Sequence, residues 1–326
     1  MTEKLIYTFI LFLSNGIALD IMDCKSGVGN LNLVWLNGEI YTYGSFGVYR
    51  VETNKGECNK IYSVDGEYDG YIKGIWSEKN LLQIVNQKGE VIVIEPESGK
   101  IERAKTGYNG RNLLYCLKSQ ELICIDEGGV FAWYTGKEWR YDEKLKGKNV
   151  TVLGMKGTKD KIFVYGYING KSGKKAFLNI YNSEGKYIDE SEKFSRYGLI
   201  KDFIYCEGKR YFLAMKELKK EEEMYSYFLV KMSEDGKVQE ISLSNDTIPY
   251  EIGCVNGEII KISLDSRSGR YIMSRMREEE VWKESIMIRS KVFLKFIGTA
   301  GNKLLFSMDN NKIIIFEYDK NKINTR

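Results

Sequence analysis

The chain repeats a short pattern in which an alternating hydrophobic strand is followed by a glycine turn and a second, more polar strand. The clearest copy, VIVIEPESGKIERAK, begins at Val91 and turns at Gly99 and Lys100. Alternation with a period of two predicts a β-strand with one buried face. Six further copies begin at Val48, Val130, Phe177, Tyr227, Tyr271 and Lys312. We therefore expect seven copies of one hairpin.

Two further strands precede each hairpin, so each repeat is expected to contain four strands. In the first repeat LNLVWL, from Leu31, turns at Asn37 and Gly38 into EIYTY, and VYRVE and CNKIY follow. Asn-Gly is a strong signal for a tight hairpin turn. Later repeats open near Val150, Leu199, Ile248 and Val292. The turns before the last strand align at Gly56, Gly99, Gly136, Gly185, Gly236, Glu279 and Asn321.

The spacing of these turns averages roughly 44 residues, which falls within the period of about 40–45 residues of four-stranded propeller blades. A small sheet cannot bury both of its faces alone, whereas blades stacked around a ring cover one another. The 23 Tyr, 32 Gly and 2 Pro of the chain suit strands joined by tight turns. The sequence predicts one all-β domain over 1–326, a seven-bladed β-propeller of four-stranded antiparallel blades that occupy 31–326.

Residues 1–30 precede the first repeat and allow two interpretations. The hydrophobic run LIYTFILFL at 5–13 could be a signal segment cleaved after Ala18, although nine residues are too few to span a bilayer. The same run could instead be a strand that turns at Asn15 and Gly16 into a second strand ending at Asp23. The last repeat ends in the polar NKINTR. We therefore expect residues 5–23 to supply the outer strand of the last blade and to close the ring.

These repeats resemble β-propeller blades of the WD, YVTN and pyrroloquinoline-quinone types, as in VIVIEPESGKIERAK. The likeness covers about 31–326 and concerns architecture alone. The Gly-His dipeptide of WD repeats is impossible here because the chain has no histidine, and no Trp-Asp pair closes a blade. The sialidase Asp box is also missing, since Ser233-Glu-Asp-Gly is out of register. The resemblance therefore implies a fold and assigns no catalytic residue.

The absence of histidine removes several classes of chemistry. Ser-His-Asp and Cys-His nucleophiles, histidine metal triads and imidazole pH sensing all require that side chain. The 49 basic and 45 acidic residues are interleaved along the chain, which does not support nucleic-acid binding. The densest charge cluster, KELKKEEE at 216–223, is expected to be a solvated hairpin loop or, alternatively, a docking site. The sequence indicates no cofactor and no metal.

Six cysteines are scattered along the chain without a C-x-x-C pair: Cys24, Cys58, Cys116, Cys124, Cys206 and Cys254. Cys116 and Cys124 flank a turn near residues 118–121. A four-residue loop would put their thiols on opposite faces, where they could not join, and a bulge would reverse this. We expect all six to be reduced and mostly buried, which favours a cytoplasmic location.

The loops that lead into the innermost strands are rich in tyrosine, glycine and charge, and they would meet at one mouth of the central channel. Lys295 is a further cation just inside a first strand. The predicted ligand-binding residues are Tyr68, Asp69, Tyr71, Lys73, Tyr108, Arg111, Arg196, Tyr197, Lys201 and Asp202. Tyrosine and arginine are favoured at recognition surfaces. The alternative is that tyrosine and glycine serve turn geometry and blade packing while the charges are solvated.

Acid–base catalysis would need two convergent carboxylates, which Asp65, Glu67, Asp69 and Asp202 could supply. Surface acids are common in turns, so we expect no enzyme. The five tryptophans fall in predicted strands, where most should pack between blades.

We expect a monomeric, non-enzymatic scaffold for a protein or peptide partner, with no membrane span. The alternative is an exported propeller that binds or cleaves carbohydrate with its tyrosine-rich mouth and a carboxylate pair.

Overall fold

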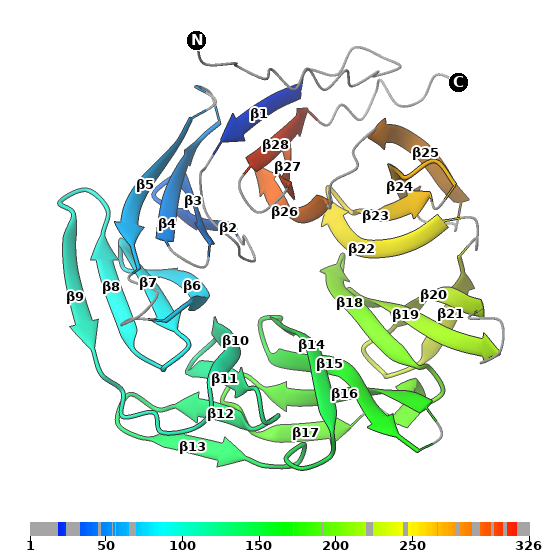
Figure 1. Ribbon diagram of the computed structural model, residues 1–326, viewed down its shortest axis with the longest axis horizontal. Coiled ribbons are helices and arrows are strands. Elements are labelled where there is room, and N and C mark those ends of the chain that lie inside the picture. Colours follow the sequence, from blue (N-terminus) through cyan, green and yellow to red (C-terminus); the bar gives the residue numbers. More distant parts are fainter. Residues whose placement is uncertain are drawn as a thin grey trace, which may run out of the picture.

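Seven four-stranded antiparallel sheets surround a central axis in the computed structural model (Figure 1). The structure describes residues 19–23, 33–44, 47–53, 55, 57–64, 70–171, 173–190, 192–219, 224–243, 247–265, 267–277, 281–288, 294–300, 303–308 and 312–317. In blades 1 to 6 the strands follow one another in chain order from the innermost strand outwards. The predicted seven-bladed, all-β propeller is confirmed.

The first four blades use consecutive strands. Blade 1 contains β2 (Leu33–Leu36), β3 (Glu39–Gly44), β4 (Gly47–Glu52) and β5 (Glu57–Ser63). Blade 2 contains β6 (Ile72–Glu78), β7 (Leu81–Asn86), β8 (Val91–Glu95) and β9 (Lys100–Ala104). Blade 3 contains β10 (Leu113–Lys118), β11 (Leu122–Asp126), β12 (Phe131–Tyr134) and β13 (Trp139–Asp142). Blade 4 contains β14 (Val150–Gly157), β15 (Lys161–Gly170), β16 (Gly173–Asn182) and β17 (Tyr187–Glu190).

The remaining blades complete the ring. Blade 5 contains β18 (Leu199–Cys206), β19 (Lys209–Lys219), β20 (Met224–Met232) and β21 (Val238–Ser242). Blade 6 contains β22 (Thr247–Val255), β23 (Glu258–Asp265), β24 (Arg270–Arg277) and β25 (Val281–Ile288). Blade 7 contains β26 (Leu294–Ala300), β27 (Lys303–Met308), β28 (Lys312–Glu317) and β1 (Leu19–Asp23). A 3-10 turn, η1 (Glu192–Phe194), precedes blade 5, and within the described ranges no helix is long and hydrophobic enough to cross a membrane.

The ring closes through the start of the chain. Strand β1 pairs antiparallel with β28, in a register that runs from Leu19 opposite Phe316 to Asp23 opposite Lys312. In Figure 1, β1 lies outside β28 and completes the last blade. The prediction that the N-terminal segment supplies this outer strand is therefore confirmed for residues 19–23. The predicted first strand at 5–13 and the cleavage site after Ala18 lie outside the described residues.

Hydrophobic side chains fill the spaces between neighbouring blades. Between blades 3 and 4, Phe131 stacks on Tyr181 with 3.7 Å between ring centroids. Between blades 4 and 5, Phe163 stacks on Phe203 at 4.5 Å. Similar clusters join blades 1 and 2, 2 and 3, 5 and 6, and 7 and 1. The core is thus a series of layers between blades, which is why a single blade could not be stable alone.

Two-residue turns join the first two strands of several blades. At Asn37 and Gly38 φ is 53° and 81°, and Asn256 and Gly257 have nearly the same values. Both residues are left-handed, as type I′ hairpin turns require, and asparagine and glycine adopt that conformation at low cost. The hairpin turn predicted at Asn-Gly is confirmed.

The cysteine prediction is wrong. Cys116 and Cys124 lie directly opposite each other on β10 and β11, so their side chains share a face and form a disulfide. Lys118 pairs with Leu122, which leaves three loop residues instead of the four that the prediction assumed. One residue fewer in the loop moves the register by one position and reverses the face on which a side chain lies.

A second disulfide joins Cys206 on β18 to Cys254 on β22 and so links blade 5 to blade 6. Cys58 is disulfide-bonded as well, and no cysteine in the described part of the chain is free. The expectation of reduced thiols is therefore overturned for the five described cysteines, and the cytoplasmic location stays a prediction.

The tryptophans mostly pack between blades as expected. Trp76 is buried, and Trp133 and Trp139 are partly buried against the clusters of blades 3 and 4 and of blades 2 and 3. Trp35, at 47% exposure, is a departure from this pattern. In the charge cluster at 216–223, residues up to Lys219 extend β19 and the others lie outside the described residues.

Candidate functional site

A cavity of about 940 Å³ occupies the centre of the ring, and the innermost strands of all seven blades contribute to its wall. The inner edge of each of these strands has no neighbouring strand, so its backbone groups and side chains face the channel. Pockets of this volume hold small ligands or short stretches of a partner chain. The channel is the site to which the seven blades contribute in common.

A β-bulge interrupts the innermost strand in six of the seven blades, as far as those strands are described. The register shifts next to Lys73, Leu114, Leu153, Lys201, Tyr250 and Ile297. A bulge leaves one residue without a partner in the ladder and redirects the side chains around it. All six of these residues line the cavity. The repeated bulge is therefore the local feature that turns side chains of the first strands into the channel.

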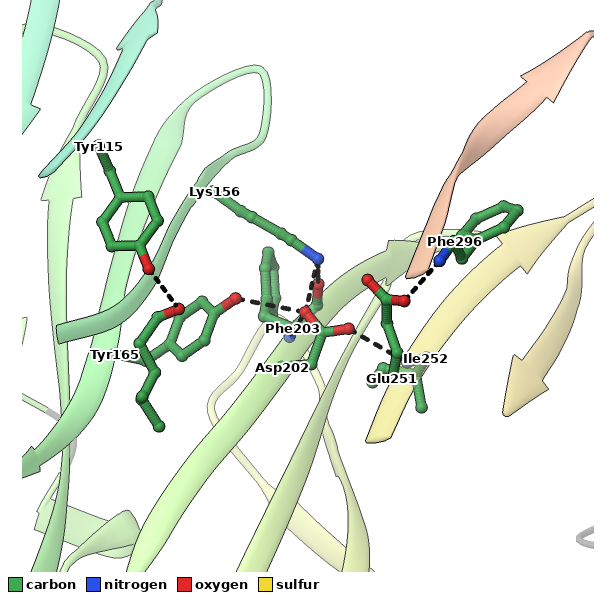
Figure 2. Close-up of polar contacts among 9 residues, drawn as sticks. Tyr115, Lys156, Tyr165, Asp202, Phe203, Glu251, Ile252 and Phe296 are labelled. Carbon is green, nitrogen blue, oxygen red and sulfur yellow. Dashed lines mark hydrogen bonds and ion pairs between the residues drawn. The ribbon is translucent and has the colours of Figure 1, made fainter. Parts of the chain in front are cut away.

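In blades 5 and 6 the residue after the bulge is acidic and reaches the next blade (Figure 2). The backbone N–H of Ile252 in blade 6 donates to Asp202 Oδ2 of blade 5 at 3.1 Å. The backbone N–H of Phe296 in blade 7 donates to Glu251 Oε2 of blade 6 at 2.6 Å. Backbone donors on an inner edge lack a ladder partner, and these carboxylates supply the missing acceptor. Each acid thus fixes the position of the innermost strand of the following blade.

In other blades the residue after the bulge is not acidic, and it contacts the following blade in another way. In blade 3 this position is Tyr115, whose hydroxyl donates to the Leu153 carbonyl of blade 4 at 3.2 Å. In blade 2 it is Gly74, where a Cβ atom would lie 2.6 Å from the Cys116 carbonyl oxygen of blade 3. Any side chain at Gly74 would therefore push the two blades apart.

Asp202 is the centre of the densest polar network in the channel (Figure 2). Its Oδ1 accepts from Lys156 Nζ at 2.6 Å and from the Tyr165 hydroxyl at 3.3 Å. Lys156 Nζ also donates to the Phe203 carbonyl at 2.8 Å. Asp202 is only 6% exposed. Burying a carboxylate is costly unless hydrogen-bond donors surround it, so the network ties blade 4 to blade 5 and offsets the cost of burying Asp202.

The pKa values of the channel residues reflect their burial. Burial, and after it the charge of Asp202, raises the pKa of Glu251 to about 8, against the opposing effect of Lys295 and Lys156. Burial lowers the pKa of Lys201 to about 8. Burial also lowers the pKa of Lys295, where the Glu251 carboxylate opposes the shift. Lysine pKa values fall when a cation loses water without gaining sufficient negative charge. The cavity wall carries four lysines, Lys73, Lys156, Lys201 and Lys295, against two carboxylates, Asp202 and Glu251.

Three of the predicted site residues line the cavity: Lys73 on β6, and Lys201 and Asp202 on β18. Lys295, expected just inside a first strand, lines it too. Tyr71 precedes β6, is 42% exposed and lies beside Lys73, whose Nζ is 5.8 Å from its ring centroid. Tyr68 and Asp69 lie outside the described residues.

The other predicted residues lie away from the cavity wall. Tyr108 packs edge-to-face on Trp139 at 4.9 Å between blades 2 and 3, and Arg111 is exposed near Gly128. Arg196 pairs with Glu240 at 2.7 Å. Tyr197 is only 2% exposed within the core between blades 4 and 5. Their part in ligand binding stays a prediction, but replacing Tyr197 would also remove core packing.

Glu251 and Lys156 were not among the residues predicted for the site. Glu251 stands at the position of Asp202 when the first hairpins are aligned on their closing pairs, Val255 with Glu258 and Cys206 with Lys209. That alignment was the available signal. The role of Lys156 depends on a contact with another blade, and nothing near it in sequence indicates this. The sequence-predicted acids at 65–69 lie outside the described residues, so the acidic pair that the structure places together is Asp202 and Glu251.

In the described part of the chain, no group of three or more Cys, Asp or Glu side chains is arranged to hold a metal ion. No family model matches the sequence, and no curated protein matches it.

Solved structures are similar to the whole ring at low sequence identity. A catalytically inactive histidine-to-alanine variant of virginiamycin B lyase from Staphylococcus aureus, with quinupristin, has a TM-score of 0.65 at 10% identity over 93% of this chain and 100% of that chain. YCF48 bound to D1 peptide has a TM-score of 0.67 at 8% identity, with 94% and 99% covered. The Cps50 (Swd1) β-propeller domain of Myceliophteria thermophila has a TM-score of 0.59 at 10% identity, with 90% and 98% covered. These likenesses establish the fold alone, and the chain is a β-propeller repeat protein.

Proposed function

We propose that the protein is a non-enzymatic scaffold that binds a protein or peptide partner at the mouth of its central channel. The observation that carries this proposal is the cavity of about 940 Å³ with walls from seven blades. The layered core makes the ring rigid, and rigid rings hold variable loops in fixed positions around such a mouth. A preformed cavity reduces the entropy cost of binding a flexible chain.

Similar solved propellers support a binding role. YCF48, which is similar over nearly the whole chain, holds a D1 peptide. Fold similarity at this identity does not transfer a function, so the support lies in the shared ring together with the cavity found here.

The proposal excludes catalysis because of the residue types that the chain contains. The similar lyase is catalytically inactive when a histidine is replaced by alanine. The present chain contains no histidine at all. A lyase that depends on that side chain would need a substitute, and Asp202 and Lys156 are already engaged in contacts between blades.

A second candidate is an exported propeller that binds or cleaves carbohydrate. The observation that favours it is the pair Asp202 and Glu251, in which burial raises the pKa of one carboxyl while the other is paired with Lys156. Glycosidases use one protonated and one ionised carboxyl in this way. Both acids also accept backbone N–H groups from the next blade, which favours a structural role. Hydrolysis of aryl glycosides that is lost in Glu251→Gln would establish this candidate instead.

We also propose that the protein matures in an oxidising compartment. The support is the pair of disulfides, Cys116–Cys124 and Cys206–Cys254. Structural disulfides persist in secreted and periplasmic proteins and are rare in the cytosol. Free-thiol titration of protein isolated from its native host tests this, because six reactive thiols per chain after denaturation without a reductant would contradict it.

Selection from a random peptide library on the intact protein tests the binding role. Leu114, a bulge residue on the cavity wall, is replaced by tryptophan to narrow the channel. Ile188→Trp is the matched control, because Ile188 is 49% exposed on β17, the outermost strand of blade 4. We expect selected peptides to lose affinity for Leu114→Trp and to keep it for Ile188→Trp. Equal affinity for the two variants would place binding outside the channel.

A further inference from the structure

We infer that the channel mouth recognises carboxylate groups of a peptide, with Lys73, Lys201 and Lys295 as the groups that bind them. This inference rests on the proposed function and names the chemistry of the partner. All three lysines line the central cavity, and they come from blades 2, 5 and 7. A ligand inside the channel could therefore contact cations from several sides of the ring.

The three lysines occupy one repeated position when residues are counted along the sequence. Each lies five residues before the residue that closes the first hairpin of its blade: Glu78 opposite Leu81, Cys206 opposite Lys209, and Ala300 opposite Lys303. At Lys73 and Lys201 this position is the bulge itself, which leaves the residue outside the ladder. In blade 7 the bulge comes two residues later, at Ile297, so Lys295 stays in the ladder opposite Ser307. The repeat thus places a cation on the channel wall in three blades, at the bulge in blades 2 and 5 and two residues before it in blade 7.

The Lys201 ammonium group is oriented by neighbouring residues and has further N–H donors for a ligand. Its Nζ donates to the Pro249 carbonyl at 2.8 Å, and it lies 4.7 Å from the ring centroid of Tyr250 and 5.5 Å from that of Tyr227. An ammonium group has three N–H donors, and within the described residues one of them makes a hydrogen bond. Its orientation is therefore fixed before a ligand arrives, which lowers the cost of binding.

The carboxylates that line the cavity are fewer than the lysines, two against four. Asp202 is paired with Lys156, a fourth lysine, and Glu251 accepts the Phe296 N–H. Burial in addition favours the neutral form of Glu251, since it raises the pKa of that carboxyl. A site with surplus buried cations is stabilised by an anion that replaces the lost water. The ligand is therefore expected to bring negative charge.

A peptide fits this site better than a nucleic acid. The cations lie inside a cavity of about 940 Å³, and acidic and basic residues are otherwise interleaved along the sequence. Peptide carboxylates come from acidic side chains or from a free C-terminus. Three unlabelled heptapeptides separate these sources: alternating Glu and Gly with both ends blocked, Gly and Ser with a free C-terminus, and Gly and Ser with both ends blocked.

Isothermal titration calorimetry of the full chain with these peptides tests the inference. Lys73→Gln and Lys201→Gln remove one cation each and keep a hydrogen-bond donor. Lys209→Gln is the matched control, because Lys209 is exposed at the opposite end of the β18–β19 hairpin from Lys201. We expect each channel variant to weaken binding of a carboxylate peptide by about tenfold, as expected for one charge-assisted hydrogen bond. The control should change affinity by less than about twofold.

Binding of the blocked acidic peptide alone identifies side-chain carboxylates, and binding of the free-ended neutral peptide alone identifies a C-terminus; both results support the inference. Equal binding of the fully blocked neutral peptide would overturn it and leave the proposed function standing. Unchanged affinity in Lys73→Gln and Lys201→Gln, or equal binding of a single-stranded RNA of the same charge, would also overturn it. If neither these peptides nor any library peptide binds, the proposed function fails as well.

Discussion

The disulfide between Cys206 and Cys254 should contribute more to stability than the one between Cys116 and Cys124, because it closes a longer loop. The sequence separations are 48 and 8 residues. In the chain-entropy account, loops of these lengths stabilise the folded state by about 4 and about 2.5 kcal/mol. With 326 residues the entropy of unfolding is about 0.7 kcal/mol/K, so these values correspond to about 6 °C and about 4 °C in Tm.

The assay is differential scanning calorimetry of two double variants, Cys206→Ala with Cys254→Ala, and Cys116→Ala with Cys124→Ala. Replacing both partners leaves no unpaired thiol, and each double variant serves as the control for the other. Wild-type protein treated with a reductant should lose at least the larger of the two shifts. The reasoning is refuted if the short-loop variant loses as much as the long-loop variant, or if reduction leaves Tm unchanged.

Three further predictions concern the channel and the closure of the ring. Asp202→Ala should lower the free energy of unfolding by about 3 kcal/mol in urea titrations, because Lys156 and the Ile252 N–H lose their acceptor, whereas the exposed control Asp235→Ala should have a much smaller effect. Stability should pass through a minimum near pH 8. It should fall as pH rises from about 4.5, because the raised pKa of Glu251 penalises ionisation, and rise again towards about 10.5, because the lowered pKa of Lys201 penalises the cation. Glu251→Gln should remove the falling limb in melts at stepped pH. Lys201→Met should reduce the rising limb without abolishing it, because burial also lowers the pKa values of Lys73 and Lys295. A flat profile in the wild type would contradict both. Deleting residues 1–23 should abolish cooperative folding by removing β1 from β28, and an unchanged Tm of the truncated chain would show that the ring closes without it.

The architecture could be predicted because its signals are local and repeated. Hydrophobic and polar residues that alternate every second position predicted the strands. Glycines such as Gly99 and Gly185 marked turns in which φ is positive. The polar end of the last repeat and the surplus strand at the start indicated how the ring closes, and β1 confirmed it. Period, turn chemistry and alternation all pointed to the same fold, as expected of a sequence that specifies one structure.

The site was predictable only where it follows the repeat. Lys73, Lys201 and Asp202 were placed correctly at the channel because they stand at the start of innermost strands. Tyr197 was predicted at the channel mouth and is buried between blades, because a tyrosine beside glycine gives the same sequence pattern in a core turn and in a binding loop. Lys156 acts through contacts between residues far apart in sequence.

The prediction that Cys116 and Cys124 are reduced was wrong for a related reason. The register of Cys116 and Cys124 turns on one residue of loop length, and SQE between Lys118 and Leu122 does not distinguish a three-residue from a four-residue loop.

Calorimetric measurement of proton uptake at pH 8 tests the central claim, that the channel binds the carboxylate of a peptide, most directly. Lys201 faces the rings of Tyr227 and Tyr250, and Glu251 faces Asp202, Lys156 and Lys295. A bound carboxylate should raise the lowered pKa of Lys201 and keep Glu251 protonated, so binding should take up protons. The account predicts that the binding heat of the acidic peptide differs between Tris and HEPES buffers and that Lys201→Gln reduces this difference. A buffer-independent heat, with full affinity retained in Lys201→Gln, would contradict it.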